Sequence, residues 1–330
     1  MRLLLIASIA ISLSSAQVYA DYSDHPNAAS FISRMVNEHG FKKAEVEYVL
    51  SQAQRKDSIL KAIARPAEKS LAWWEYRRIF LDDQRINKGV AFWNKHAASI
   101  AKASEQYQVD PEIIVAIIGV ETRYGENMGS YRVLDALATL GLDYPPRAKF
   151  FNKELENFLL LAREQKQDPL VLKGSYAGAM GYGQFMPSSY RAYAKDFDGD
   201  AIADIWENPQ DAIASVANYF KVHGWDKDQQ VLVRVGDMQR YRIKETSINN
   251  GKRPSFTQDY LARQDIKPSQ TITNPSDKIA LLSYQEKTRN DLWMGLPNFY
   301  TITRYNRSRL YARAVWELSM AIEDKFNASR

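Results

Sequence analysis

The sequence predicts a mainly helical protein of the α+β class with one small β-containing part. Apolar residues recur at three- and four-residue spacing through residues 21–104, as expected for packed helices. β-branched and alternating segments gather at 231–235 and 241–243, just before the turn-forming residues 249–251. With 330 residues, 45% of them hydrophobic and 25% charged, the chain is composed like a globular protein of two or three lobes.

The first twenty residues have the features of a secretory signal. Arg2 supplies the positive start, residues 3–13 are apolar, and Val18-Tyr19-Ala20 offers small residues for cleavage. We therefore expect a mature chain that begins after Ala20 and is soluble in the periplasm. No later stretch is long and apolar enough for a transmembrane anchor. The absence of cysteine excludes thiol catalysis, disulfides, Cys-ligated zinc and a lipid-bearing cysteine.

The charge of the chain argues against nucleic acid as a partner. The formal net charge is +5, and no basic run is interleaved with aromatic residues in the manner of a nucleic-acid groove. Such a mild positive charge is compatible with weak attraction to an acidic polymer such as cell wall. Solubility alone explains it equally well.

Six aromatic residues cluster within the helical segment 21–104. Their spacing is typical of packing between helices, and we favour that interpretation over a platform for sugar rings. The six are Trp73, Trp74, Tyr76, Phe80, Phe92 and Trp93.

Glu121 is the residue that most strongly indicates chemistry. It ends the apolar run 113–120, for which Asp110 is the expected N-cap, Pro111 the first helical residue and Gly125 the stop. Burial in low dielectric favours the neutral form of a carboxyl, which a general acid needs near neutral pH. A buried Glu paired with a nearby arginine is about as compatible with these residues.

A second cluster lies at residues 174–187, where four glycines alternate with Ser175, Gln184 and aromatic residues. Glycines let a bulky ligand approach the backbone, aromatic rings stack on pyranose faces, and Ser or Gln supplies fixed hydrogen bonds. The segment therefore predicts a surface for a sugar chain. Taken alone, a glycine cluster is a weak signal, since tight turns use glycine too.

An acidic loop predicts a calcium site of the EF-hand type. Asp196, Asp198 and Asp200 place carboxylates at alternate positions, and Ile202 can add its backbone carbonyl. Helices are expected on both sides of the loop. Because Ala201 stands where such loops usually have glycine, we expect a strained turn.

The carboxylate that closes this loop is ambiguous from the residues. Glu207 and Asp211 both follow at a suitable distance, and spacing alone favours Glu207. We expect the calcium to be structural, because the loop joins two helices.

Four segments together resemble the lytic murein transglycosylase B family: Gly119–Gly125, 175–187, the acidic loop and Thr303–Asn306. The similarity covers essentially the whole mature chain. It implies a lysozyme-like catalytic core flanked by a helical and a small β domain. It also implies cleavage of the β-1,4 bond between N-acetylmuramic acid and N-acetylglucosamine of peptidoglycan, with no water added and a 1,6-anhydromuramoyl end formed. The wall-synthesis machinery is a further candidate partner.

On this basis the chain divides into five parts. These are a signal peptide at 1–20, a helical domain at 21–104, the catalytic core with its calcium loop at 105–228, a small β-containing insertion at 229–278, and a return to the core at 279–330.

The resemblance also implies the site residues. Glu121 is the sole acid and base, and Ser175 and Gln184 lie where the family contacts Glu or substrate. The residues that line the substrate site are Arg147, Tyr219, Tyr305, Asn306 and Tyr311. In the calcium loop the resemblance favours Asp211 over Glu207, although this sequence has an extra residue between the two. The chain departs from the family at Pro146, where a second arginine is often found, and in lacking the lipobox cysteine of anchored members.

Two other functions are compatible with these features. The first is a lysozyme-type hydrolase in which Glu126, Asp135 or Asp143 positions a water. The second is a non-catalytic, calcium-dependent wall-binding protein. A purely structural Glu121, paired with Arg123 or Arg132, is the least favoured interpretation.

Overall fold

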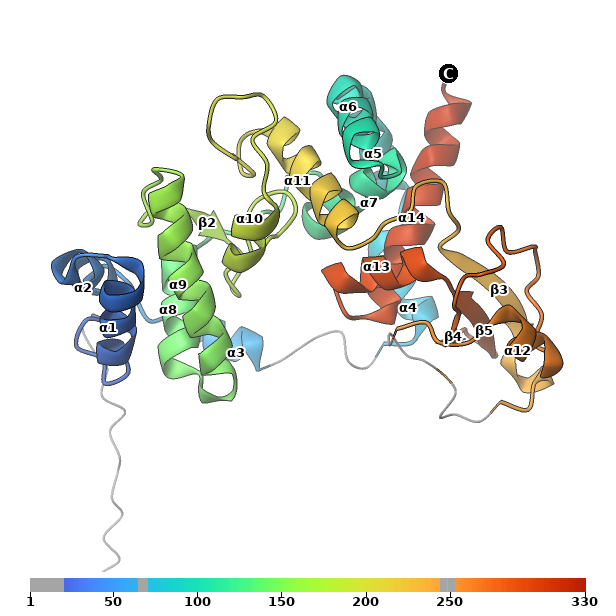
Figure 1. The fold of residues 1–330 in the computed structure, drawn as a ribbon, viewed down its shortest axis with the longest axis horizontal. Coiled ribbons are helices and arrows are strands. Elements are labelled where there is room, and N and C mark those ends of the chain that lie inside the picture. Colours follow the sequence, from blue (N-terminus) through green and yellow to red (C-terminus); the bar gives the residue numbers. More distant parts are fainter. Residues whose placement is uncertain (1–20, 65–70, 244–247, 249–252) are drawn as a thin grey trace, which may run out of the picture.

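The computed structural model describes residues 21–64, 71–243, 248 and 253–330 (Figure 1). The predicted secretory signal at 1–20 lies outside the described residues. These residues are mainly helical and carry one three-stranded sheet, which confirms the predicted fold class. None of their helices has the length and apolar character needed to cross a membrane.

One group of helices forms the end of the molecule drawn at the left of Figure 1. The long helix α9 packs along α8, α1 packs on α9 and α2, and α3 packs on α8. The first turns of α9 are partly exposed, but residues 154–162 are all buried, including the carboxylates of Glu154 and Glu156. The bounds are α1 Ala28–His39, α2 Lys43–Ser51, α3 Asp57–Ile63, α8 Val133–Asp143 and α9 Ala148–Glu164.

The centre of the molecule is built around α7, Pro111–Thr122, whose residues Ile113 to Val120 are all buried. Helices α5, α6, α11 and α14 surround it, and α10 connects α11 to α9. Helices α4 and α13 also lie in this part of the molecule. The bounds are α4 Trp73–Phe80, α5 Asp83–Lys95, α6 Ala97–Tyr107, α10 Pro187–Tyr193, α11 Pro209–Val222, α13 Pro297–Tyr305 and α14 Arg309–Ala328. A helix that is apolar on all sides requires such a complete shell of neighbours.

The start of α7 differs in one respect from the sequence prediction. Asp110 and Pro111 occupy the N-cap and first helical positions as predicted, but the Asp110 side chain does not cap the helix. Its carboxylate accepts hydrogen bonds from the indole N–H of Trp225, at 2.8 Å, and from the N–H of Asp228. Burial raises the pKa of Asp110. The carboxylate therefore ties the 225–228 segment to α7.

The aromatic cluster is mostly core, as its spacing predicted. Trp73, Tyr76, Phe92 and Trp93 are buried, whereas Trp74 and Phe80 are partly exposed.

The sheet has the order β3-β5-β4 and is antiparallel throughout. Strand β3, Leu232–Asp237, confirms the predicted strand at 231–235. The expected strand at 241–243 is wrong, because those residues form a bend and coil. The remaining strands are β4 Ala280–Gln285 and β5 Asn290–Gly295, and the helix α12 Gln258–Arg263 lies beside them. A pair of two-residue strands, β1 Tyr131–Arg132 and β2 Lys173–Gly174, and the turns η2 Pro145–Arg147 and η3 Met238–Arg240 complete the list.

The two faces of the sheet belong to different cores. Leu232, Leu282 and Trp293 pack into the main core shared with the helices. Their neighbours Leu281 and Met294 point to the other face and form a small separate core with α12. Because successive side chains of a strand alternate between faces, the sheet joins both cores.

Candidate active site and calcium loop

Glu121 lies in the last turn of α7, at the point where the chain leaves the helix through a strained turn. Arg123 and Tyr124 have φ values of 51° and 64°, and Gly125 follows at 93°. Left-handed backbone costs a non-glycine residue about 1 kcal/mol. The helix therefore ends at Thr122, three residues before the predicted stop at Gly125. Strain of this kind is typical of functional sites.

Two residues that the sequence did not indicate hold this turn. The hydroxyl of Thr122 lies 3.1 Å from the Ile118 carbonyl and 3.0 Å from that of Tyr182, and it accepts from the N–H of Gly125. Arg85 on α5 is buried and donates to the Gly119 carbonyl at 3.1 Å. Thr122 thereby fixes the end of α7 against the 174–187 segment, which lies far away in the sequence.

Tyr311 on α14 donates a hydrogen bond from its phenol to the Glu121 carboxylate, with 2.5 Å between the oxygens. Burial and the negative charge of Glu121 raise the pKa of Tyr305 and Tyr311 well above its ordinary value. Both phenols therefore stay protonated and can donate. Glu121 itself is only partly buried, so it is more accessible than the apolar run predicted.

Tyr219, Tyr305 and the 174–187 segment form an aromatic wall next to this pair. The rings of Tyr219 and Tyr305 lie 4.7 Å apart between centroids, and Phe185 packs against both. The Tyr305 phenol donates to the Gly183 carbonyl and that of Tyr219 to the Arg304 carbonyl, at 2.5 and 2.6 Å. The structure thus brings Glu121, Tyr219, Tyr305 and Tyr311 together from four helices, α7, α11, α13 and α14.

The glycines of the 174–187 segment have a different role from the one predicted. A Cβ on Gly183 would lie 2.8 Å from the Tyr305 hydroxyl, and one on Gly181 would lie 2.4 Å from the Ile205 carbonyl. Gly174 and Gly178 are likewise crowded by Ala179 and Leu137. Side chains are excluded at these positions by the protein's own atoms, so close approach of a ligand is not needed to explain the glycines.

Gln184 lies at the edge of this wall with its backbone in the left-handed region, at φ 49°. Its amide nitrogen donates to the carbonyls of Gly181 and Met128 at 3.0 and 3.2 Å. The side chain therefore links the 174–187 segment to the loop that follows Glu121.

The other predicted substrate residues occupy defined turns. The Ser175 hydroxyl accepts from the N–H of Ala179 at 3.0 Å, and Asn306 accepts from the N–H of Ser308 at 3.1 Å between α13 and α14. Arg147 lies in η2 with its guanidinium 4.5 Å from the Phe150 ring. These contacts fix each of the three side chains within its own part of the chain.

The three carboxylates considered for the alternative hydrolase each have a partner other than Glu121. Glu126 is exposed and paired with Lys88, Asp135 is buried and paired with Arg132 at 2.7 Å, and Asp143 accepts from the Tyr22 phenol at 2.6 Å. Arg123 pairs with Asp82 at 3.4 Å. The arginines of the structural alternative thus have other carboxylate partners.

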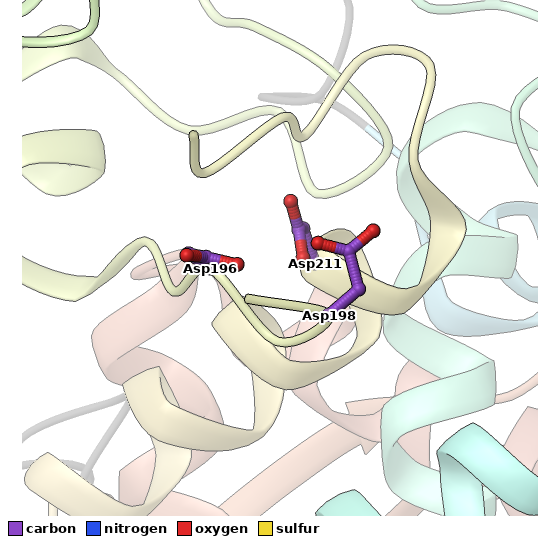
Figure 2. Close-up of side chains that lie close together, drawn as sticks. All are labelled: Asp196, Asp198 and Asp211. Carbon is purple, nitrogen blue, oxygen red and sulfur yellow. The ribbon is translucent and has the colours of Figure 1, made fainter. Parts of the chain in front are cut away.

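The acidic loop brings three carboxylates together. Oxygen atoms of Asp196, Asp198 and Asp211 lie within 4.8 Å of one another. In Figure 2 Asp196 and Asp198 extend from the loop and Asp211 from the start of α11, toward a common space. Burial, followed by the charges of Asp198 and Asp196, raises the pKa of Asp211 to about 6. A cation would offset that repulsion, so the donor set suits a hard ion.

The remaining loop residues shape the turn. Ala201 has φ 72°, which confirms the strain predicted for a residue in a glycine position. Asp200 accepts from the N–H of Ile202, and Asp204 accepts from the N–H of Glu207. Asp211, not Glu207, belongs to the carboxylate group. Helices α10 and α11 flank the loop as expected, and Asn208 caps α11 by accepting from Gln210 at 3.0 Å.

Comparison with known proteins identifies the relatives of this chain. Residues 23–320 match the model of the transglycosylase SLT domain. Membrane-bound lytic murein transglycosylase B of Escherichia coli (strain K12) is 47% identical over 315 residues, which cover 93% of this chain and 85% of that protein.

Solved structures agree with this relationship. The crystal structure of soluble lytic transglycosylase SltB1 from Pseudomonas aeruginosa matches with a TM-score of 0.84 and 50% identity over 91% of this chain and 99% of the other. The Escherichia coli lytic transglycosylase SLT35 in complex with calcium matches with a TM-score of 0.83 and 48% identity over 92% and 94%.

Proposed function

The chain belongs to the transglycosylase SLT domain family and is a lytic murein transglycosylase, and we propose that Glu121 performs its chemistry as the sole acid and base. The observation that carries this proposal is the hydrogen bond from Tyr311 to Glu121 at the strained end of α7. It gives one accessible carboxyl a fixed position beside an aromatic wall suited to sugar rings.

The reaction proceeds in two proton transfers. Neutral Glu121 gives its proton to the glycosidic oxygen while the bond to the muramoyl anomeric carbon breaks. The substrate's own acetamido group stabilises the positive charge on that carbon. The Glu121 carboxylate then takes the proton of the muramoyl C6 hydroxyl, whose oxygen bonds to the anomeric carbon. The product is a 1,6-anhydromuramoyl end, no water is consumed, and Glu121 returns to its neutral form.

Tyr311 supports the second transfer. A hydrogen bond donated to a carboxyl favours its ionised form, which is the form of Glu121 between the two transfers. The Tyr219 and Tyr305 rings are rigid because their phenols are fixed on backbone carbonyls. They can therefore hold the glycan with little loss of side-chain entropy. Ser175, Gln184, Asn306 and Arg147 are proposed to contact more distant sugars.

Calcium is proposed to hold the acidic loop. The carboxylates of Asp196, Asp198, Asp200 and Asp211 and the carbonyl of Ile202 would be its ligands, and the ion would supply structural rather than chemical support. The proximity of Asp196, Asp198 and Asp211 and the calcium complex of the relative SLT35 support this.

The proposed location is the periplasm, after removal of residues 1–20. Peptidoglycan glycan strands are the proposed substrate, since the relative from Escherichia coli is a murein transglycosylase. The wall-synthesis machinery is a further proposed partner.

Replacement of Glu121 by Gln tests the proposal. The amide keeps the size of the side chain but cannot transfer protons, so we expect release of soluble muropeptides from purified murein to fall by roughly 10²–10⁴-fold. Binding of glycan strands and the thermal transition should change little. The matched control is Glu126→Gln, which removes an exposed carboxyl from the same turn.

The two variants also separate the proposal from the hydrolase. The E126Q variant should digest murein at the wild-type rate. Loss of turnover in E126Q equal to that in E121Q would show that two carboxylates act, as in most glycosidases.

A further inference from the structure

A basic cavity of about 670 Å³ lies between α4, the sheet and the face of α14 that carries Arg313. Its floor is formed by Trp293, Asp291 and Arg313, which are all at least nine-tenths buried. Its rim includes Trp74 and Arg78 of α4. The cavity contains none of the residues assigned to the active site.

Positive charge dominates the lining. Six cationic side chains line the cavity together with two carboxylates, Glu286 and Asp291, and a third carboxylate beside it, Glu317, pairs with Arg77 and Arg313 at 3.3 and 2.8 Å. Asp291 is shared between Arg234 and Arg289 at 3.0 and 2.7 Å, so neither arginine is fully neutralised. Within the described residues, Arg78 and Lys287 have no ion pair at all. The excess charge favours an anionic ligand.

Two buried donors on the floor lack acceptors. The indole N–H of Trp293 and the Nη1 atom of Arg313 make no hydrogen bond with any described residue. That Arg313 nitrogen lies 3.5 Å from a carboxylate oxygen of Glu286, and the Nε atom of the same guanidinium pairs with Glu317 at 2.8 Å. An unsatisfied buried donor costs roughly 1–3 kcal/mol, so these atoms indicate a missing acceptor. The Arg313 guanidinium is nevertheless held in place, because it lies 4.3–4.6 Å from the centroids of three aromatic rings.

We propose that this cavity binds carboxylate groups of the peptide stems that the glycan substrate carries. A planar carboxylate can accept from Trp293 and Arg313 at the floor, while a second carboxylate of the same stem pairs with Arg78 or Lys287 at the rim. The proposal rests on the proposed function for its choice of ligand. Helix α14 connects the two sites, since it carries both Tyr311 and Arg313.

The test uses the mature chain with Arg78→Gln and Lys287→Gln combined. Neither side chain forms an ion pair with a described residue, and Lys287 only lies over the Trp74 ring at 5.6 Å, so the variant should fold normally. We expect kcat/KM to fall about fivefold on murein strands that keep their stems. On strands stripped of stems by an amidase it should remain at the wild-type value. The control with the same loss of charge is Lys61→Gln with Arg263→Gln, two exposed cations outside the cavity that form no ion pair with a described residue, and it should change neither rate.

A binding measurement locates the effect. The indole N–H signal of Trp293 is followed by NMR in the Glu121→Gln chain and assigned with Trp293→Phe. We expect a free stem tripeptide to shift it, and to shift it less in the combined Arg78 and Lys287 variant. Inorganic phosphate serves as the second probe and should compete only weakly.

Three results would overturn the proposal. These are an equal loss of kcat/KM on both substrates, no loss on either, or an indole signal that phosphate moves and the peptide does not. Failure of the proposed function would look different. Stem-free strands treated with the wild-type chain would then carry no anhydro ends, whatever the indole signal does.

Discussion

Glu121 and Tyr311 are 190 residues apart in the sequence and face each other from α7 and α14. The apolar surroundings of Glu121 disfavour charge on its carboxyl, and the Tyr311 phenol favours it. An acid that must become a base in the same turnover requires such a balance, because its two forms need comparable free energies. The partial exposure of Glu121 leaves room for the sugar to reach it.

Replacement of Tyr311 by Phe should therefore slow turnover without unfolding the protein. Hydrogen bonds to charged groups contribute about 1.5–3 kcal/mol, so we expect kcat to fall roughly 10- to 100-fold with little change in KM. The control is Tyr284→Phe, which removes a buried phenol that donates to the Arg309 carbonyl instead. Wild-type kcat in the Tyr311 variant would exclude a role of the phenol in catalysis.

The site could be predicted from the sequence only in part. Glu121 is conspicuous because it interrupts an apolar run, and the tyrosines come from the resemblance to the family. Arg85 and Thr122 leave no comparable pattern, since each acts on a backbone carbonyl that folding brings within reach. The predicted burial of Glu121 was too complete, because a helix end next to a strained turn is open to solvent.

At the level of elements, the acidic loop combines favourable ligands with an unfavourable backbone. Asp211 is fixed by the N–H groups of Phe197 and Asp204, which donate to its carboxylate at 2.7 and 2.8 Å. Ala201, by contrast, holds a left-handed conformation that glycine adopts freely. The loop is therefore preorganised at its buried end and strained at its tip.

Two substitutions in this loop should change calcium affinity in opposite directions. Ala201→Gly relieves about 1 kcal/mol of strain and should strengthen binding about fivefold, whereas Gly199→Ala introduces strain at φ 90° and should weaken it. Calorimetric titration with calcium measures both. Chelation should lower the melting temperature of the wild-type chain and leave the pH dependence of turnover unchanged. A melting temperature indifferent to chelation, together with equal affinities of the variants, would contradict a metal site.

Strands β4 and β5 were not predicted from the sequence, for the same physical reason. Strand β5 is buried at five consecutive residues, and β4 at four of its six, so neither shows the alternation of a half-exposed strand. Neither has the β-branched residues typical of strands, and β4 begins with Ala280-Leu281-Leu282, which favour helices when isolated. Tertiary packing between two cores decides their conformation, and that information is absent from a local window.

At the scale of the whole molecule, the sheet couples the small β-containing part to the catalytic helices. Leu282 and Leu281 are adjacent in β4 and equally buried, yet Leu282 faces the helical core and Leu281 the small core with α12. Helix α4 packs on β4 and on α14, and Trp316 of α14 contacts Trp293 of β5, so the active-site helix α14 depends on the first face.

Two leucine-to-alanine substitutions test whether the two cores are stabilised independently. Leu282→Ala and Leu281→Ala should each destabilise its own core by roughly 2–5 kcal/mol. Hydrogen exchange should become faster in α4 and α14 for Leu282→Ala, and in α12 for Leu281→Ala with α7 unaffected. Identical exchange maps for the two variants would mean that the cores unfold as a single unit.

The central claim is that one carboxyl completes the reaction without water, and labelled water tests it most directly. Purified murein is digested by the mature chain in water enriched in heavy oxygen, and the released muropeptides are weighed by mass spectrometry. We predict muramoyl ends that are lighter than reducing ends by one water and carry no label. Labelled reducing ends from the first turnovers onward would contradict the account.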